Sequence, residues 1–373
     1  MGRGEAVPVR LCVAAGGTGG HIYPALAIAR AALDAGVAHE VRFVGARGGM
    51  EERLVPAAGF SLHTLPVRGM VRKRPSEWAR AAAGLGVSVV RAAVFLRRFR
   101  PDVVLGTGGY AAGPVGAAAA ALRVPLVLQE QNTVPGVTNR LLARHAARIA
   151  IPYPEAAAGF PQGARLVVTG NPIRPELLGV DPTEARRRLG LAAGGRVVLM
   201  VAGSRGSAVF VRWLPELAAG LREGTLLFVS GGAHHGAARA AADGLARVRV
   251  VPYLEAMGDG LAAADVVVGR AGAIFLAELA AVGRPALLVP SPHVTHHHQE
   301  VNAAVFGRAG AAEVLAEPHT NGADLARRIT ALLGDAQRRQ TMAAAARALA
   351  RPQALADLVA VLAEAAGSRG KGR

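Results

Sequence analysis

The sequence predicts an α/β protein with two domains, each built on a parallel sheet covered by helices. Short apolar runs alternate with longer helical patterns throughout its 373 residues, as in sheets whose strands are joined by helical crossovers. The pattern forms two series that open alike, each with a strand, a glycine-bearing loop and a helix: VRLCVAAGGTGGHIYPALAIA in the first and VVLMVAGSRGSAVFVRWLPEL in the second. We therefore expect one architecture used twice.

The expected strands are the short apolar runs. In the first series they are residues 10–14, 40–44, 102–105, 125–128 and 148–151. In the second series they are residues 197–201, 226–230, 248–251, 265–268 and 286–289. Between the series, Gly170, Asn171, Pro172 and Pro175 are residue types that end helices and strands, so we expect the domain hinge there. A final apolar helix is expected at about 354–366, followed by an irregular tail, GSRGKGR.

Composition limits the classes of partner. The chain carries 43 lysine and arginine residues against 26 aspartates and glutamates, a formal net charge of +17. Such a charge attracts anions, whether nucleic acid, an anionic bilayer or a phosphorylated small molecule, and does not choose among them. Nucleic acid is disfavoured, because aromatic residues make up only 4% of the chain and none is interleaved with the basic run as a stacking platform.

The sequence also indicates a compartment. A single cysteine, Cys12, excludes an internal disulfide. The first residues lack a signal-peptide pattern, because Glu5 and Pro8 interrupt any apolar core. The longest uncharged run, 103–122, is too rich in glycine for a spanning helix and predicts a strand, a turn and a buried helix. We expect a cytoplasmic protein whose membrane contact is peripheral.

The first glycine loop, GGTGGH at residues 16–21, joins the first expected strand to a helix. Loops of this kind bring backbone N–H groups close to a phosphate at a helix N-terminus. The spacing matches neither the dinucleotide fingerprint nor a Walker A loop. His21 closes the loop, and imidazole suits a general base near neutral pH. We predict anion contact by the loop and a base role for His21; a glycine turn packed for steric reasons alone is the alternative.

Two further loops follow neighbouring strands. GTGGYAAGP at residues 106–114 follows the strand 102–105, and the polar run QEQN at 129–132 follows the strand 125–128. Because the carboxyl ends of parallel strands meet at one edge of a sheet, we expect all three loops to line one crevice. Glu130 and Asn132 are candidate functional residues there, and polar residues that merely end a strand are the alternative.

In the second domain, GSRG at residues 203–206 offers hydroxyl and backbone donors for a diphosphate. The run RAGAIFLAE at 270–278 begins a helix after the strand 265–268. Glu278 is a lone acid in that apolar helix start, and a carboxylate accepts hydrogen bonds from both hydroxyls of a ribose. A simple interaction with the helix dipole is the alternative.

The histidines at 293, 296, 297 and 298 do not predict a metal site. Adjacent histidines point in different directions, and no Asp or Cys partner lies nearby in the sequence. No Asp-x-Asp pair is present nearby to hold a magnesium diphosphate complex. We expect neither a metal nor another cofactor.

A basic and apolar segment, RGMVRKRP at residues 68–75, leads into a helix that begins near Trp78. Basic residues beside exposed apolar ones bind anionic bilayers. The candidates for membrane contact are Met70, Arg72, Lys73, Arg74 and Trp78. A core-facing helix with solvated arginines is the alternative.

Together these motifs resemble the MurG family, the bacterial peptidoglycan N-acetylglucosaminyltransferases of glycosyltransferase family 28. The matching segments run in order along nearly the whole chain: GGTGGHIYPALAIA, GTGGYAAGP, QEQNTVPGVTNRLLA, GNPIR, GSRGS and the stretch from ADVVVGRAGAIFLAELAAVGRPALLVP to HHQEVNA. The resemblance implies the GT-B fold, in which two Rossmann-like parallel-sheet domains face each other across a cleft. It implies an acceptor and membrane-side domain at 1–172, onto which the segment at about 352–373 packs back, and a donor-binding domain at 173–351.

The resemblance also implies an activity. The family moves N-acetylglucosamine from UDP-N-acetylglucosamine to the 4-hydroxyl of undecaprenyl-diphospho-muramoyl-pentapeptide (lipid I), which yields lipid II with inversion to a β-linkage. We expect the same donor and lipid-linked acceptor here, and a peripheral protein on the anionic cytoplasmic face of the cell membrane.

The family's site residues transfer to matching positions. Donor contacts fall on Thr18, Gly19, Gly20, Asn132, Arg174, Ser204, Leu254, Ala273, Ile274, Phe275, Leu276, Ala277, Glu278 and Gln299. Among these, Leu254 would meet uracil through its backbone and Glu278 would meet the ribose. His21 matches the family histidine and is assigned the base role, with Glu130 or Asn132 helping to position the acceptor. The loop residues Gly108, Gly109 and Tyr110 are assigned to the acceptor side.

The chain departs from the family pattern at several positions. Arg205 stands where the family often has glutamine, and Ala271 and Ala277 stand where it often has serine. The rival interpretations are another GT-B enzyme, such as a UDP-N-acetylglucosamine 2-epimerase or a transferase with a soluble acceptor, and a non-catalytic basic protein that binds nucleic acid or a membrane. A soluble acceptor gives no reason for the basic, apolar segment at 70–78.

Overall fold

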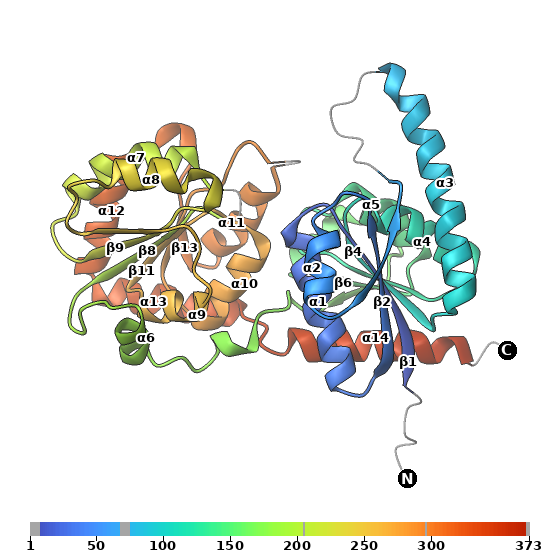
Figure 1. Ribbon diagram of the computed structural model, residues 1–373. Helices are drawn as coiled ribbons and strands as arrows, with labels where there is room; N and C mark the ends of the chain where they lie inside the picture. The colour runs from blue at the N-terminus through green and yellow to red at the C-terminus, as the bar shows by residue number, and fades with distance from the viewer. Residues whose placement is uncertain (1–7, 68–74, 204–205, 295–296, 371–373) are drawn as a thin grey trace, which may run out of the picture. The chain divides into compact units, whose positions relative to one another are not determined.

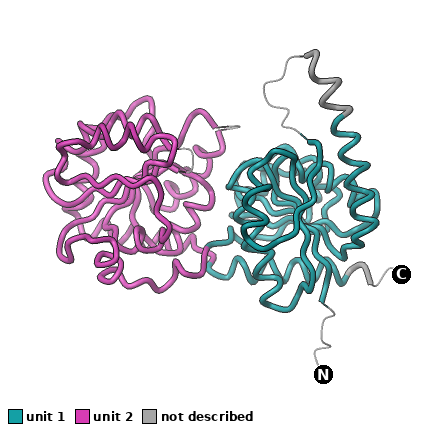
Figure 2. Tube along the Cα trace, viewed as in Figure 1, with its two compact units in different colours: residues 1–173, 352–373 teal, residues 174–351 magenta. Residues whose placement is uncertain are grey.

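The computed structural model describes residues 8–67, 75–203, 206–294 and 297–370, without the side chains of residues 75–83 and 368–370. It consists of two compact units (Figure 2). Unit 1 comprises residues 1–173 and 352–373, and unit 2 comprises residues 174–351. Each unit has its own all-parallel sheet, so the predicted fold class of two parallel-sheet α/β domains is confirmed.

Unit 1 is built on a seven-stranded parallel sheet with the order β3-β2-β1-β4-β5-β6-β7. Figure 1 labels β1, β2, β4 and β6 of this sheet. The strands are β1 (Val9–Ala15), β2 (Ala38–Ala46), β3 (Ser61–Leu65), β4 (Val103–Gly108), β5 (Leu126–Gln129), β6 (Arg148–Ile151) and β7 (Leu166–Val168). The central strands β4 and β5 are buried along their whole length, because helices cover both faces of the sheet.

The helices of unit 1 are α1 (Gly19–Asp34), α2 (Glu51–Ala57), α3 (Pro75–Phe99), α4 (Ala112–Ala121), α5 (Val137–Leu142) and α14 (Ala354–Gly370). Alternate residues of β1 point to opposite faces of the sheet, and each face has its own core. Ile28 of α1 and Leu362 of α14 belong to one core. Leu96 of α3 and Val115 of α4 belong to the other.

Unit 2 repeats this plan with a six-stranded parallel sheet in the order β10-β9-β8-β11-β12-β13. The strands are β8 (Val197–Val201), β9 (Thr225–Val229), β10 (Val248–Val251), β11 (Val266–Gly269), β12 (Ala286–Leu288) and β13 (Ala312–Val314). The helices are α6 (Pro182–Arg188), α7 (Ala208–Gly220), α8 (His235–Ala241), α9 (Met257–Ala263), α10 (Ala273–Val282), α11 (His298–Arg308), α12 (Gly322–Gly334) and α13 (Ala336–Leu349). Phe210 of α7 and Ile329 of α12 are fully buried in one core with Val198 and Met200 of β8.

Every strand expected from the sequence is present, but three others were not predicted. These are β3, β7 and β13, which lie at sheet edges. They are short, and their burial pattern alternates or stays intermediate, so they lack the continuous apolar run that marks a buried strand. Their pairing with a neighbouring strand, rather than their own sequence, makes them strands.

The C-terminal helix also differs from its prediction. It was expected to end at about residue 366 and to give way to an irregular tail, but α14 continues to Gly370. Ala365 and Ala366 are buried against unit 1, and each further residue of a formed helix adds a backbone hydrogen bond at little cost. Core contacts thus hold the helix as far as Ala366, and its continuation to Gly370 follows from helix cooperativity.

All strands of each sheet are parallel, but the direction in which successive strands are added reverses between two central strands. In unit 1 the chain runs outward in both directions from the pair β1 and β4, and in unit 2 from the pair β8 and β11. Loops that leave the carboxyl ends of two such strands diverge, and open α/β sheets bind their ligands there. This topology brings each predicted glycine loop to a binding position.

At the amino ends of both strand pairs, an aspartate accepts a hydrogen bond from the backbone of the neighbouring strand. In unit 1, Asp102 precedes β4, and its Oδ2 accepts a hydrogen bond from the N–H of Arg10 in β1 (2.8 Å). In unit 2, Asp265 precedes β11, and its Oδ2 accepts from the N–H of Val197 in β8 (2.8 Å). The backbone N–H of each aspartate bonds back to the carbonyl of the same partner. Both sheets therefore fix the register of their central pair with an aspartate.

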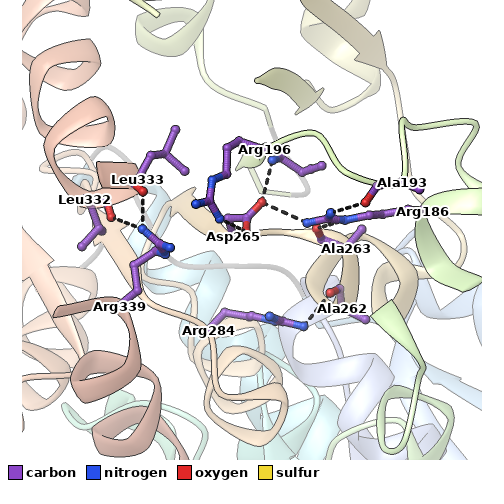
Figure 3. A network of polar contacts seen from close by, with 11 residues as sticks. Arg186, Ala193, Arg196, Ala262, Ala263, Asp265, Arg284, Leu332, Leu333 and Arg339 are labelled. Carbon is purple, nitrogen blue, oxygen red and sulfur yellow. Dashed lines mark hydrogen bonds and ion pairs between the residues drawn. The ribbon is translucent and has the colours of Figure 1, made fainter. Parts of the chain in front are cut away.

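In unit 2 this aspartate also holds two arginines (Figure 3). Asp265 Oδ2 accepts from Arg186 Nη2 (3.0 Å), and Oδ1 accepts from Arg196 Nη1 (3.3 Å). Arg186 donates in addition to the carbonyls of Ala263 (3.1 Å) and Ala193 (2.8 Å). The network joins α6 and α9 to the amino ends of β8 and β11.

We expect Asp265→Ala to lower the free energy of unfolding of unit 2 by about 2–4 kcal/mol, because it removes these hydrogen bonds and leaves Arg186, whose side chain is 17% exposed, without a counter-charge. Glu184→Ala is the control, since Glu184 pairs with Arg187 at the surface, where solvent screens the pair and its loss should change stability little. Urea unfolding in a Trp78→Phe background isolates the fluorescence of Trp213, which is buried in unit 2. Equal losses for both variants would contradict the assigned role of Asp265.

Candidate active site

The two glycine loops of unit 1 are in direct contact at the carboxyl ends of β1 and β4. Gly108 and Gly109 have φ angles of 102° and 81°, which favour glycine. A Cβ placed on Gly109 would overlap the carbonyl oxygen of Gly16, so a side chain there would separate the loops. The loops that the sequence places after neighbouring strands thus form one continuous surface.

His21 lies in the first turn of α1 and is half-buried between these loops. A Cβ on Gly108 would lie 2.9 Å from Cδ2 and 3.1 Å from Nε2 of the imidazole, so the ring packs directly on this glycine. The Nδ1 atom lies 3.3 Å from Thr18 Oγ1. The hydroxyl of Thr107 donates to the carbonyl of His21 (3.0 Å). Both loops therefore hold the predicted base in place.

Glu130 is 2% exposed and makes hydrogen bonds with both carboxylate oxygens. Its Oε1 accepts from the backbone N–H (2.9 Å) and the side-chain amide (3.3 Å) of Asn132. Its Oε2 accepts from the N–H of Gly136 (2.9 Å) and from Asn139 Nδ2 (2.9 Å). With both oxygens in use, Glu130 shapes the 130–136 loop that carries Asn132, rather than moving a proton itself.

A chain of buried amides that the sequence did not single out links this loop to its surroundings. Gln131 Nε2 donates to the carbonyl of Thr107 (2.8 Å), and Asn171 Nδ2 donates to the carbonyl of Gln131 (2.8 Å). Gln129 Nε2 donates to Asn171 Oδ1 (3.1 Å). The polar run at 129–132 was a visible signal, but its partners lie 24 to 42 residues away in sequence and only the fold identifies them.

Glu51 is a second residue that sequence reasoning missed. It is the first residue of α2, it is fully buried, and its Oε1 accepts a hydrogen bond from the N–H of Ala46 (2.7 Å). An acid in the first turn of a helix is common and gave no sequence signal. Its surroundings include Gly16 of the first glycine loop.

In unit 2 the loop after β8 packs on the loop after β9. A Cβ on Gly231 would lie 2.7 Å from the nitrogen and from the Cα of Gly206, and both glycines have positive φ angles of 77° and 73°. The predicted diphosphate loop at 203–206 is thus anchored at its end. Ser204 and Arg205 lie outside the described residues.

Glu278 and Arg174 are 104 residues apart in sequence and form an ion pair in unit 2. Arg174 Nε and Nη2 both lie 3.0 Å from Glu278 Oε1. Glu278 Oε2 has no hydrogen bond to the part of the chain that the structure describes. Burial raises the pKa of the Glu278 carboxyl above its ordinary value, and Arg174 opposes this shift. The pair presents one carboxylate oxygen for a further ligand.

The helix start that carries Glu278 is partly exposed and has no acidic residue in its first turn. α10 begins at Ala273 after Gly272, and it has no acidic residue in its first turn. Ala273, Ile274, Phe275 and Ala277 are partly exposed, whereas the side chain of Leu276 is fully buried in the core. The partial positive charge of a helix N-terminus attracts anions, and no acidic side chain in this first turn opposes it.

The two remaining donor candidates of unit 2 lie on other loops at the same edge of the sheet. Leu254 is half-buried in the loop that follows β10, and a Cβ on Gly260 would lie 2.5 Å from its Cδ2. Gln299 in the first turn of α11 accepts a hydrogen bond at Oε1 from the N–H of Ser291 (2.9 Å). Within the described ranges its amide nitrogen has no acceptor, so it remains able to donate.

The predicted membrane residues are described only in part. Met70, Arg72, Lys73 and Arg74 lie outside the described residues, and Trp78 lies in α3 with its side chain not described. Tyr110 is 42% exposed, and its ring lies 3.6 Å from a Cβ placed on Gly17. No helix in the described part of the chain is both long and apolar enough to span a bilayer.

The described residues offer no metal site. They contain no group of three His, Cys, Asp or Glu side chains close enough to hold a metal ion. Of the clustered histidines, His297 pairs with Glu300 (3.2 Å), and His296 lies outside the described residues.

Comparisons with known proteins agree with this arrangement. The model of the glycosyltransferase family 28 N-terminal domain matches residues 11–151, and that of the C-terminal domain matches residues 197–359. A transferase of Moorella thermoacetica is 42% identical over 365 residues, covering 95% of this chain and 98% of its own length. A second, of Symbiobacterium thermophilum, is 44% identical and covers 93% of each chain. Both are named UDP-N-acetylglucosamine–N-acetylmuramyl-(pentapeptide) pyrophosphoryl-undecaprenol N-acetylglucosamine transferase.

Solved structures give the same result for the fold. MurG of Acinetobacter baumannii superposes with a TM-score of 0.79 at 29% identity, covering 96% of this chain and all of its own. The UDP-GlcNAc 2-epimerase of Neisseria meningitidis superposes with a TM-score of 0.67 at 14% identity, covering 95% of this chain and all of its own, a likeness of fold alone. Because two family models and relatives above 40% identity extend over most of its length, the chain belongs to glycosyltransferase family 28 and is a glycosyltransferase with the GT-B fold.

Proposed function

We propose that the protein transfers N-acetylglucosamine from UDP-N-acetylglucosamine to the 4-hydroxyl of undecaprenyl-diphospho-muramoyl-pentapeptide in peptidoglycan synthesis. The observation that carries this proposal is the full-length similarity to transferases named for this donor and acceptor, at 42–44% identity. The 2-epimerase alternative rests on a likeness of fold at 14% identity and has no such support.

Unit 2 holds the donor in this proposal. Glu278 Oε2 accepts hydrogen bonds from the ribose hydroxyls, while Arg174 keeps the carboxylate in place through Oε1. The backbone of Leu254 meets the uracil ring, and the Gln299 amide donates to the donor substrate. The N–H groups at the first turn of α10 bind the negative charge of the donor diphosphate, and Ser204 is assigned to the same substrate.

Unit 1 carries the base and the acceptor. For His21 to take a proton at Nε2, its Nδ1 must carry the hydrogen, and Thr18 Oγ1 at 3.3 Å is placed to accept it. Thr18, Gly19 and Gly20 supply the loop that meets the transferred sugar. The 130–136 loop, held by Glu130, presents Asn132, and Gly108, Gly109 and Tyr110 line the acceptor side.

The reaction is then a single displacement. His21 removes the proton of the acceptor hydroxyl as its oxygen attacks the anomeric carbon from the face opposite UDP, and the configuration inverts. The leaving diphosphate gains negative charge as the bond breaks. The α10 N-terminus is a fixed positive group that stabilises it without needing to reorganise.

We further propose peripheral attachment to an anionic membrane through the segment at 70–78. The adjoining helix α3 exposes Val87, Val90 and Val94, which are 49%, 64% and 42% accessible and share one helix face. Apolar side chains beside arginines favour an interfacial position, and the net charge of +17 adds long-range attraction.

The first test is the transfer of labelled N-acetylglucosamine to a short-chain lipid-linked muramoyl-pentapeptide with EDTA present. We expect product that depends on acceptor and resists EDTA, and we expect His21→Gln to lower kcat by about 10²–10⁴ while UDP affinity stays unchanged. An assay without acceptor detects epimerised UDP-sugar. Epimerised sugar without transfer would overturn the proposed activity, and full turnover by His21→Gln would overturn the base assignment.

The raised pKa of Glu278 predicts a pH-dependent donor affinity. Only the ionised carboxylate accepts from both ribose hydroxyls, so affinity for UDP should rise as pH increases through this raised pKa. Glu278→Gln should weaken UDP binding by about 10-fold to 100-fold at neutral pH. It should also abolish the step in affinity, that is, the rise with pH through the pKa of Glu278.

Calorimetry over a pH series measures both effects. UDP itself titrates in the same way with wild type and with Glu278→Gln, so the difference between their affinity profiles leaves only the contribution of Glu278. The matched control is Glu176→Gln, because Glu176 is exposed and its charge raises the pKa of Glu278. This variant should move the step to lower pH and keep the affinity at neutral pH. Identical pH profiles for wild type and Glu278→Gln would rule out a ribose contact by Glu278.

Membrane attachment is tested by sedimentation with vesicles of anionic or zwitterionic lipid. Reversing Arg72, Lys73 and Arg74 to glutamate should weaken binding to anionic vesicles by at least about 100-fold, at roughly 1 kcal/mol for each basic residue at the surface. The control reverses Arg212, Arg222 and Arg239, exposed residues of unit 2, and changes the net charge by the same amount. Equal losses for both triple variants would assign binding to overall charge and not to this segment.

A further inference from the structure

Three glycines from separate segments surround the buried side chain of Glu51. A Cβ on Gly16 would lie 2.5 Å from its Oε1, and a Cβ on Gly45 would lie 2.5 Å from its Cγ. A Cβ on Gly49 would overlap the carboxylate itself, at 2.5 Å from Cδ. Gly16 follows β1, Gly45 lies in β2, and Gly49 lies in the turn before α2. We call Gly16, Gly45 and Gly49 the glycine cage.

The glycine cage encloses an acidic side chain with one carboxylate oxygen that lacks a hydrogen-bond donor among the described residues. Glu51 is 0% exposed, and its Oε1 accepts a hydrogen bond from the N–H of Ala46 (2.7 Å). Its Oε2 is buried and has no hydrogen-bond partner among the described residues. A buried carboxylate oxygen without a donor destabilises a protein, so packing alone would favour an apolar residue here.

The cage also connects to the candidate active site. Gly16 lies between Glu51 on one side and Gly109 on the other, because a Cβ on Gly109 would overlap its carbonyl oxygen. The neighbouring Gly108 packs on the ring of His21. Glu51 is therefore the support behind the first glycine loop, at the residue where both loops meet.

We propose that Glu51 is a positioning residue that fills the glycine cage, fixes Gly16 against Gly109 and so holds the 16–20 loop and His21 in their working geometry. The role of His21 in this statement rests on the proposed function, whereas the contacts within the cage do not. Glu51 itself touches no substrate and transfers no proton.

The variants are chosen to separate positioning from stability. Glu51→Gln keeps the volume and the oxygen that accepts from Ala46, whereas Glu51→Ala empties the cage. Gly16→Ala places a methyl group against Glu51, and combining it with Glu51→Ala removes that clash. Glu52→Gln is the matched control, because Glu52 is the adjacent acid of α2 and is exposed.

Thermal unfolding, UDP binding and transfer kinetics are measured for each variant. We expect Glu51→Ala to lower kcat by about 10-fold to 100-fold at temperatures where it is folded, since small misplacements of reacting groups cost that much. UDP affinity should stay unchanged, and Glu51→Gln should restore kcat to within about threefold of wild type. In the double variant the unfolding temperature should recover relative to Gly16→Ala alone while kcat stays low. If kcat recovered together with stability, or if Glu51→Ala turned over like wild type, the proposal would be wrong.

A measurement that needs no turnover separates this proposal from the proposed function. The imidazole resonances of His21, assigned with His21→Gln, should move in Glu51→Ala and stay in place in Glu51→Gln and Glu52→Gln. If wild type transferred no sugar but these resonances moved as expected, the proposed function would fail and the positioning role would stand. Unmoved resonances in Glu51→Ala would refute the positioning role whatever the enzyme transfers.

Discussion

Two loops of unit 1 approach so closely that only glycine fits between their backbones, and the candidate site around His21 depends on this contact. Gly109 lies where any Cβ would overlap the carbonyl oxygen of Gly16, and Gly108 lies against the ring of His21. The two loops can therefore share one surface at the carboxyl ends of β1 and β4. The hydrogen bonds of Thr18 and Thr107 then fix the orientation of His21 on that surface.

The candidate donor site around Glu278 depends on electrostatics more than on close packing. α10 begins without an acidic residue, so its N-terminus keeps its positive character, and Glu278 one and a half turns later is buried and paired with Arg174. Burial raises the pKa of this carboxyl while Arg174 lowers it. The arrangement places a carboxylate paired with an arginine on the same short helix as a start that has no acidic residue.

The two units use the same scaffold for different tasks. Asp102 and Asp265 tie the central strands of the two sheets with hydrogen bonds of equal length, at the ends remote from the glycine loops. This separation leaves the loops at the carboxyl ends free to differ. In unit 1 they carry His21 and the Glu130 loop, and in unit 2 they carry Glu278 and Gln299.

The sequence by itself determined the features that have a local signature. Alternating apolar and helical patterns predicted the parallel sheets and each central strand, and the glycine spacing located the loops and His21, because these depend on near neighbours in the chain. The tertiary structure alone decided that β3, β7 and β13 are strands, since an edge strand is defined by the neighbour it pairs with. It alone also revealed the Glu51 cage and the amide chain to Asn171, because these contacts join residues far apart in sequence. A buried carboxylate or amide carries no mark in its own segment, and its partners exist only once the chain has folded.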